Sequence, residues 1–255
     1  MSFAVVSLVV VTCLSLDIMW DLQLLFFIFF ATITGYNFIK YSRLAKWHHL
    51  SLTESLRSIQ VFSFLSFIGL CYFAFKVSQD VILACAGMAI LTVLYALPVF
   101  SKKRNLRALP GMKMYTICGV WAGATVLLPA LQENRTIDWD IWVLLAQRFL
   151  FVLVITLPFD IRDLKYDATE IGTIPSRVGV KKTKMVGVLL LILMVLLESL
   201  KDEITSLNLL STLVIAIFSG ILLIRASEKQ SRYYASLFVE SIPIVWLILL
   251  LSLTY

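Results

Sequence analysis

The sequence contains little charge for its length. Of its 255 residues, only 15% are charged, whereas 60% are hydrophobic and the mean hydropathy is +0.92. A soluble domain has about 25% charged and about 45–50% apolar residues, so this chain lacks the polar surface to cover a globule in water. The composition therefore excludes an ordinary soluble protein and predicts an all-α integral membrane protein that crosses the bilayer several times.

Cysteine is scarce as well, and its placement argues against two further classes. The four cysteines all lie in apolar runs, no CxxC is present, and no pair falls in a predicted aqueous loop. This pattern favours neither a disulfide framework nor a thiolate metal site. Long hydrophilic stretches are also missing, so we expect one membrane domain over residues 1–255 and no separate soluble domain.

Nine apolar runs remain as candidate membrane helices, since about 20 residues cross about 30 Å of hydrocarbon. They cover roughly 2–16, 22–41, 58–76, 80–99, 112–131, 140–159, 185–199, 205–224 and 234–254. The first run reaches only ~22 Å and lacks the basic start and cleavage site of a signal peptide. One explanation of its length is a helix that begins upstream of Met1.

The net charge of +6 could suggest a nucleic-acid partner, but the distribution of charge indicates a membrane topology instead. Four predicted loops, at 40–57, 101–113, 160–184 and 225–232, hold most of the basic residues. These are Lys40, Arg43, Lys46, Arg57, Lys102, Lys103, Arg104, Arg107, Lys113, Arg162, Lys165, Arg177, Lys181, Lys182, Lys184, Arg225, Lys229 and Arg232. The alternate loops are acidic, with Asp17, Asp21, Asp80, Glu133, Asp138, Asp140, Glu198, Asp202 and Glu203.

This alternation orients the chain. Basic loops face the cytoplasm, which predicts a cytoplasmic N-terminus and an outer C-terminus across nine helices. We expect a multi-pass protein of a bacterial inner (plasma) membrane, surrounded by membrane lipids and without a nucleic-acid partner.

The third basic loop begins with three aspartates, Asp160, Asp163 and Asp167. On a helix this spacing places all three within about 60° of one face over two turns. Clustered carboxylates repel each other unless a cation lies between them, and Mg2+ favours such oxygen ligands and bridges them to substrate phosphates. The other predicted helices carry no such cluster at a cytoplasmic end. We therefore favour a Mg2+ site over a solvated helix end paired with Arg162 and Lys165.

The segment 172–179 that follows reads Gly-Thr-Ile-Pro-Ser-Arg-Val-Gly. Its glycines and proline predict a structured loop rather than a continuing helix. The bases after it, Lys181, Lys182 and Lys184, could face an anionic substrate or anionic headgroups.

These residues resemble a known family. Asp160-x-x-Asp163-x-x-x-Asp167 and the 172–179 segment are similar to the second aspartate-rich motif and following loop of the UbiA superfamily of intramembrane prenyltransferases. Tyr95-x-x-Pro98, before the basic 102–107 loop, falls in the matching order. The resemblance covers nearly the whole chain. It implies a UbiA-like bundle of nine helices, a polyprenyl diphosphate donor, a lipophilic acceptor and Mg2+ held by each of two motifs.

The first motif of the family departs from its pattern here. Asn37 is retained, but Phe38, Tyr41 and Ala45 stand where the family carries aspartates. The resemblance then implies metal ligation by the three aspartates of the second motif together with Asn37. Lys40 or Arg43 could replace the second metal by binding phosphate directly, or both could be ordinary positive-inside residues.

The resemblance also supplies the candidate site residues. Catalytic and metal-binding roles fall on Asp160, Asp163, Asp167 and Asn37. Substrate contacts are expected from Lys40, Arg43, Tyr41, Tyr95, Lys102, Arg162 and Arg177.

Two functions follow from this sequence. The first is Mg2+-dependent transfer of a polyprenyl group from a diphosphate donor to a lipophilic acceptor. The second is a catalytically impaired family member that binds a prenyl lipid or diphosphate or serves as a membrane scaffold, which the degraded first motif favours. A transporter is disfavoured because the charges gather at one membrane face rather than along a path.

Two further features concern packing. Arg148 and Glu240 lie within predicted helices, where each needs a partner or a cavity, so a pair between them is one possibility. The spacing Gly119-x-x-x-Gly123 is typical of close helix contacts.

Overall fold

The computed structural model describes residues 1–41, 54–96, 111–164, 173–231 and 233–254. Within these ranges the chain is helical, without a β-strand. The α-helices are α1 (Ser2–Ser15), α2 (Leu22–Tyr41), α3 (Glu54–Ala74), α4 (Gln79–Ala96), α5 (Met112–Ala122), α6 (Leu128–Gln132), α7 (Trp139–Asp163), α8 (Ile174–Leu196), α9 (Ser206–Arg225) and α10 (Ile242–Thr254). Two π-helical turns, η3 (Gly123–Leu127) and η5 (Tyr234–Val239), and one 3-10 turn, η4 (Leu197–Leu200), continue them.

Within the described residues, every apolar run predicted from the sequence falls on these helical segments, and the last three residues of the 80–99 run lie outside them. In the part of the chain that the structure describes, seven segments are long and apolar enough to cross a membrane, and the apolar helices Ser2–Ser15 and Gln79–Tyr95 are shorter. An α-helix suits a lipid environment because it satisfies its own backbone hydrogen bonds. The integral membrane class is therefore confirmed, while nine crossings and a cytoplasmic N-terminus stay predictions.

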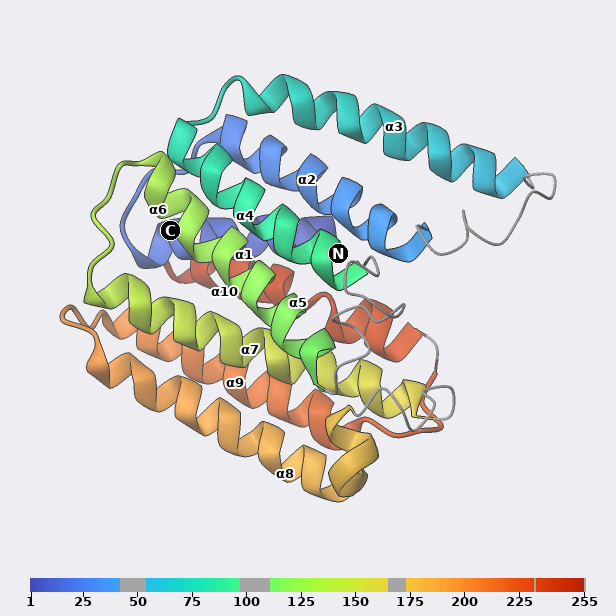
Figure 1. The fold of residues 1–255 in the computed structure, drawn as a ribbon. Helices are drawn as coiled ribbons and strands as arrows, with labels where there is room; N and C mark the ends of the chain where they lie inside the picture. Colours follow the sequence, from blue (N-terminus) through green and yellow to red (C-terminus); the bar gives the residue numbers. More distant parts are fainter. Residues whose placement is uncertain (42–53, 97–110, 165–172, 232, 255) are drawn as a thin grey trace.

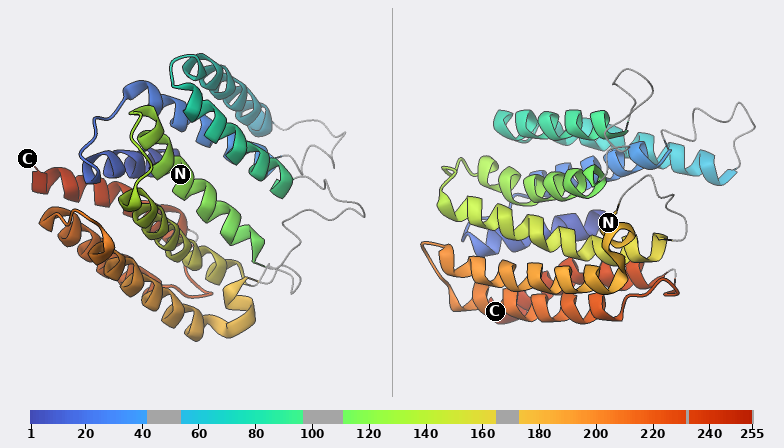
Figure 2. Two further views of the ribbon diagram at one scale, coloured as in Figure 1. Left: turned by 60° about the vertical axis from the view of Figure 1, so that its left-hand side comes forward. Right: turned by 60° about the horizontal axis from the view of Figure 1, so that its bottom comes forward.

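The helices form a layered bundle in which α7 is central. Figures 1 and 2 show α2 and α3 at one side, α8 and α9 at the other, and α4, α5 and α7 between them. Two thirds of the α7 span is buried, against 6% of the α3 span. The core contains Phe151, Leu157 and Ile161 of α7, packed with residues of α1, α8, α9 and α10. Side chains projecting from the end of α7 are therefore positioned by the best-packed part of the molecule.

The helices α2, α4, α7 and α9 all finish at one end of the bundle, which we call the basic end (Figure 1). The connections at the opposite end carry acidic residues such as Asp17, Asp21 and Asp138, and we call it the acidic end. Most residues of the predicted basic loops lie outside the described part of the chain, so the separation of basic and acidic loops stays a prediction.

The segment after the three aspartates differs from its prediction. We expected a loop, but α8 begins at Ile174 and is broken only at Gly179, where φ is +80° and ψ is 159°. Pro175 lies in the first turn, where backbone N–H groups have no partner within the helix, so the N–H that proline lacks is not missed there. Only glycine readily adopts the backbone angles of residue 179, so a short helical turn precedes the long part of α8.

The pair suggested between Arg148 and Glu240 does not form, and that prediction was wrong. Glu240 forms an ion pair with the amino group of Met1. Arg148 instead donates from Nη2 to Thr12 Oγ1 at 2.9 Å. The two charges were assigned to each other because each needs a partner, but the packing of α1 brings a different group to each.

Of the two glycines at 119 and 123, only Gly123 lies in close contact with another helix. A Cβ built on Gly123 would lie 2.9 Å from Met88 Sδ, whereas one on Gly119 would meet no atom of the described residues within 4 Å. Among the described glycines, the tightest contact is at Gly187 of α8. A Cβ there would overlap Leu223 Cδ2 of α9 and lie 2.9 Å from Leu157 Cδ1 of α7.

Replacing Gly187 with alanine should therefore lower the free energy of unfolding by about 1–3 kcal/mol, the usual cost of overpacking. Gly119→Ala is the matched control, since it adds the same methyl group in open space and improves helix propensity. Reversible unfolding in detergent, followed by circular dichroism, measures both. Equal stabilities of the two variants would contradict the close approach of α8 to α7 and α9.

Candidate active site

The candidate site is built on the end of α7, which continues past Pro158 to Asp163. Proline removes one helical hydrogen bond, yet the helix is held at this point from outside. Gln230 Nε2 donates to the Pro158 carbonyl at 2.7 Å, and Gln230 Oε1 accepts from the Ser227 backbone N–H at 3.1 Å. The turn after α9 thus fixes the last two turns of α7, where the aspartates lie.

Asp160 and Asp163 lie on this last stretch of helix, one turn apart. Asp160 is buried, with 2% of its surface exposed. The side chain of Asp163 is one third exposed. Residues three apart on a helix share a face, so the two carboxylates lie on the same side of α7, as the sequence predicts. The third acidic residue, Asp167, lies outside the described residues.

Asp163 already carries a counter-charge in this structure. Arg162 Nε donates to Asp163 Oδ1 at 2.7 Å and Arg162 Nη2 to Oδ2 at 3.1 Å. The guanidinium carbon lies 5.5 Å from the centre of the Phe159 ring. Such a two-point contact satisfies both carboxylate oxygens. Arg162 was expected to contact substrate, and the described contacts place it on the neighbouring acid.

No group of three potential metal ligands occurs among the described residues. Because the predicted metal site includes Asp167, this observation does not test it. Asp160 and Asp163 supply carboxylate oxygens of the kind that Mg2+ prefers, so the donors that are described fit such an ion chemically.

The first part of the degraded motif, from Asn37 to Tyr41, lies on the last turns of α2 at the same basic end, and Ala45 lies outside the described residues. Asn37 Nδ2 donates to Ser63 Oγ of α3 at 2.7 Å, and Ser63 Oγ in turn donates to the Ile59 carbonyl. This contact uses the amide nitrogen of Asn37 and not the oxygen that a metal would bind. The α2 end and the α7 end lie on opposite sides of α4 and α5 (Figures 1 and 2).

The other predicted substrate residues are distributed around the basic end. Lys40 is exposed, and its Nζ lies 5.5 Å from the centre of the Tyr36 ring. Tyr95 is buried near the end of α4, and Arg177 is exposed on the first turn of α8. Tyr41 is the last residue of α2. Arg43 and Lys102 lie outside the described residues.

Two residues at this end were missed from the sequence. Gln230 holds the backbone of α7 from 72 residues away, and no local pattern reveals such a contact. Thr173 precedes α8, and its buried Oγ1 has no hydrogen-bond partner among the described residues. A buried hydroxyl without a partner is costly and is a candidate for contact with a ligand. The sequence feature that could have indicated Thr173 is its position inside the 172–179 segment.

Comparison with known proteins supports the architecture. No protein-family model and no curated protein sequence matches this chain. One solved structure, described as digeranylgeranylglyceryl phosphate synthase in membranes, matches with a TM-score of 0.61 at 17% sequence identity. The match covers 98% of this chain and 92% of that one. The chain therefore has the fold of that membrane synthase over nearly its whole length.

Proposed function

We propose that this protein is a UbiA-type membrane prenyltransferase, which moves a polyprenyl group from a diphosphate donor to a lipophilic acceptor with Mg2+. The observation that carries the proposal is the pair Asp160 and Asp163 on the last turn of α7, in a chain with the fold of a membrane prenyltransferase. The order of the sequence motifs along the chain supports the same family.

The chemistry explains why acids and bases are needed together at the basic end. Prenyl transfer breaks the C–O bond to an allylic diphosphate, leaving an allylic carbocation that the acceptor attacks and a pyrophosphate that carries the negative charge. Bound Mg2+ would neutralise charge on that leaving group. Its proposed ligands are Asp160, Asp163 and Asp167 from the α7 side of the diphosphate and Asn37 from the α2 side.

The bases of the site act on the same diphosphate. Lys40, Arg43, Lys102 and Arg177 are proposed to bind its oxygens directly, because ammonium and guanidinium groups donate strong hydrogen bonds to phosphate. In this proposal Arg162 balances Asp163 until the charged substrate arrives. Tyr41 and Tyr95 are proposed to line the prenyl chain next to the allylic carbocation, because an aromatic face attracts a cation.

A second candidate is a catalytically impaired family member that binds a prenyl lipid or its diphosphate. The substitutions Phe38, Tyr41 and Ala45 in the first motif favour it, as does the bond that ties Asn37 to α3. The two candidates share the fold and the ligand and differ in turnover.

Release of pyrophosphate by the purified protein tests the proposal. Geranyl, farnesyl and longer diphosphates are offered with a panel of lipophilic acceptors, with Mg2+ or with an excess of chelator. We expect release that depends on Mg2+ and on an acceptor. Binding of a diphosphate without release under any combination would establish the impaired member, and neither binding nor release would contradict both.

A further inference from the structure

A second site of charge lies deep in the bundle, away from the candidate active site. Arg148 of α7 is 1% exposed and is among the largest fully buried side chains. It lies nine residues after Trp139 and twelve before Asp160, about 13 Å from the start of α7 and about 18 Å from Asp160 along the helix axis. Its charge therefore lies well away from the aspartates of the candidate active site.

The contacts of Arg148 leave much of its guanidinium unsatisfied. Nη2 donates to Thr12 Oγ1 of α1, and the guanidinium carbon lies 5.1 Å from the centre of the Trp246 ring of α10. Nε and Nη1 are buried and have no hydrogen-bond partner among the described residues. A guanidinium carries five N–H donors, and a buried donor without a partner is destabilising.

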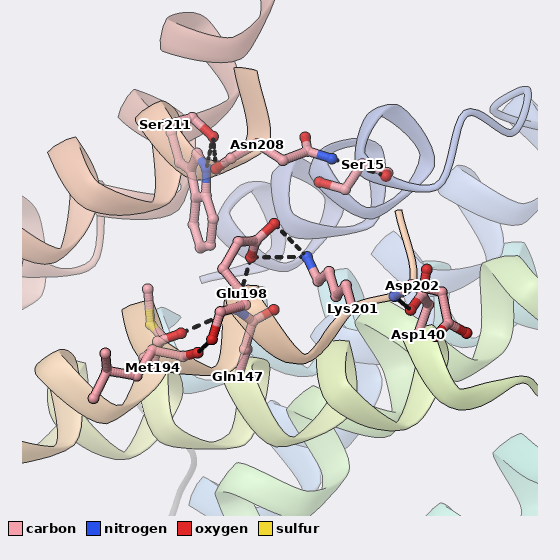
Figure 3. A network of polar contacts seen from close by, with 12 residues as sticks. Ser15, Asp140, Gln147, Met194, Glu198, Lys201, Asp202, Asn208 and Ser211 are labelled. Carbon is pink, nitrogen blue, oxygen red and sulfur yellow. Dashed lines mark hydrogen bonds and ion pairs between the residues drawn. The ribbon is translucent and has the colours of Figure 1, made fainter. Parts of the chain in front are cut away.

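The neighbouring charges do not compensate it. Gln147, the adjacent residue, donates to Glu198 Oε2 at 2.8 Å, and both oxygens of Glu198 accept from Lys201 Nζ at 2.8 Å. Figure 3 shows this group at the junction of α7, η4 and α9. Glu198 is thus neutralised by Lys201, so the buried groups Arg148, Glu198 and Lys201 carry one net positive charge.

We propose that Arg148 binds a small monovalent anion, such as chloride, between α1, α7 and α10. The N–H groups that lack partners are the donors for this ion, and an isolated positive charge in a low-dielectric interior strongly favours a counter-ion. The core between α1, α7 and α10 contains buried apolar side chains such as Leu8, Phe151 and Trp246, so we expect a small, weakly hydrated anion and not a lipid phosphate.

In this proposal Trp246 controls access to the site. Its indole covers the guanidinium and packs edge-on against Phe151, with ring centroids 5.1 Å apart. The indole Nε1 has one long hydrogen bond of 3.4 Å, to Ser211 Oγ. Nε and Nη1 of Arg148 are fully covered in the structure, so the ion needs room that a rotation of the indole would provide. The weak bond to Ser211 offers little resistance to such a rotation.

The experiment measures thermal unfolding of the full-length protein in chloride and in gluconate at equal ionic strength. We expect chloride to raise the unfolding temperature in a saturable way, by about 5–10 °C at a roughly hundredfold excess over Kd. Arg148→Gln should lose the difference between the two salts. Arg135→Gln is the matched control, because Arg135 is a partly exposed arginine in the acidic-end loop that pairs with Asp138. It should keep the full chloride effect.

A direct measurement covers the case in which Arg148→Gln does not fold. Crystals of the unaltered protein grown in bromide should show an anomalous peak at hydrogen-bond distance from the Arg148 guanidinium. Two results overturn the proposal. One is equal unfolding temperatures in chloride and gluconate together with no bromide peak. The other is an Arg148→Gln variant that keeps the chloride effect, which would assign the ion to another site.

Discussion

Replacing Asp163 with asparagine should lower Mg2+-dependent pyrophosphate release by about 10²–10³-fold, the effect of removing one preorganised charge from a transition-state site. Asparagine keeps the shape of the side chain but loses the negative charge. It also ends the ion pair with Arg162. That pair is partly exposed to solvent, with 26% of the Arg162 side chain and 33% of the Asp163 side chain accessible, so the free energy of unfolding should change by less than about 1 kcal/mol. A loss of pyrophosphate release in Asp163→Asn would therefore not be explained by a loss of stability.

Asp140→Asn is the matched control for this prediction. Asp140 lies in the first turn of the same helix, at the acidic end, where its Oδ1 accepts from the Asp202 N–H at 2.7 Å. Release should stay within about twofold of the unaltered protein, the usual behaviour of a surface substitution away from the site. Binding of Mn2+, followed by electron paramagnetic resonance, gives a readout without turnover and should weaken only in Asp163→Asn. Unchanged release and metal binding in that variant would exclude Asp163 as a metal ligand.

The helices could be predicted from the sequence because a segment in lipid has no water to bond its backbone N–H and C=O groups. A segment such as Leu22–Tyr41 must satisfy its own N–H and C=O groups, so an apolar run of this length is a helix whatever it packs against. The placement of Asp160 and Asp163 on one helical face follows in the same way from their spacing. Both are local properties, and both agree with the structure.

The interactions that the sequence did not reveal are the long-range ones. Arg148 was paired with Glu240 on charge alone, but its bond is to Thr12, 136 residues away. Asn37 was expected to face the aspartates, and its amide nitrogen bonds to Ser63 of the neighbouring helix. In each case the partner depends on which helices pack together, and many arrangements of apolar helices are compatible with the same hydropathy.

The 172–179 segment illustrates a different limit, since its local signals were interpreted in the wrong direction. Glycine and proline indicate loops on average. Pro175, however, lies in the one turn of a helix that tolerates it, and Gly179 interrupts the helix without ending it. Composition alone does not distinguish a proline that begins a helix from one that precludes it.

The buried polar group at the acidic end leads to the largest stability effect that we expect. Glu198 is fully buried, with 1% of its side chain exposed, and Lys201 is 7% exposed (Figure 3). Replacing Glu198 with alanine leaves the Lys201 ammonium buried without its counter-charge and removes an acceptor from Gln147. The loss should be about 3–5 kcal/mol in the free energy of unfolding, measured by denaturant titration in detergent.

The control and the double variant decide whether this loss comes from the unpaired charge. Glu203→Ala removes an exposed acid five residues away and should cost less than about 0.5 kcal/mol. Combining Glu198→Leu with Lys201→Met removes both charges, and replacement of a buried ion pair by apolar side chains of similar volume is often neutral or stabilising. The double variant should therefore be more stable than Glu198→Ala. If it is equally unstable, the loss comes from packing around residue 198 and not from the charge of Lys201.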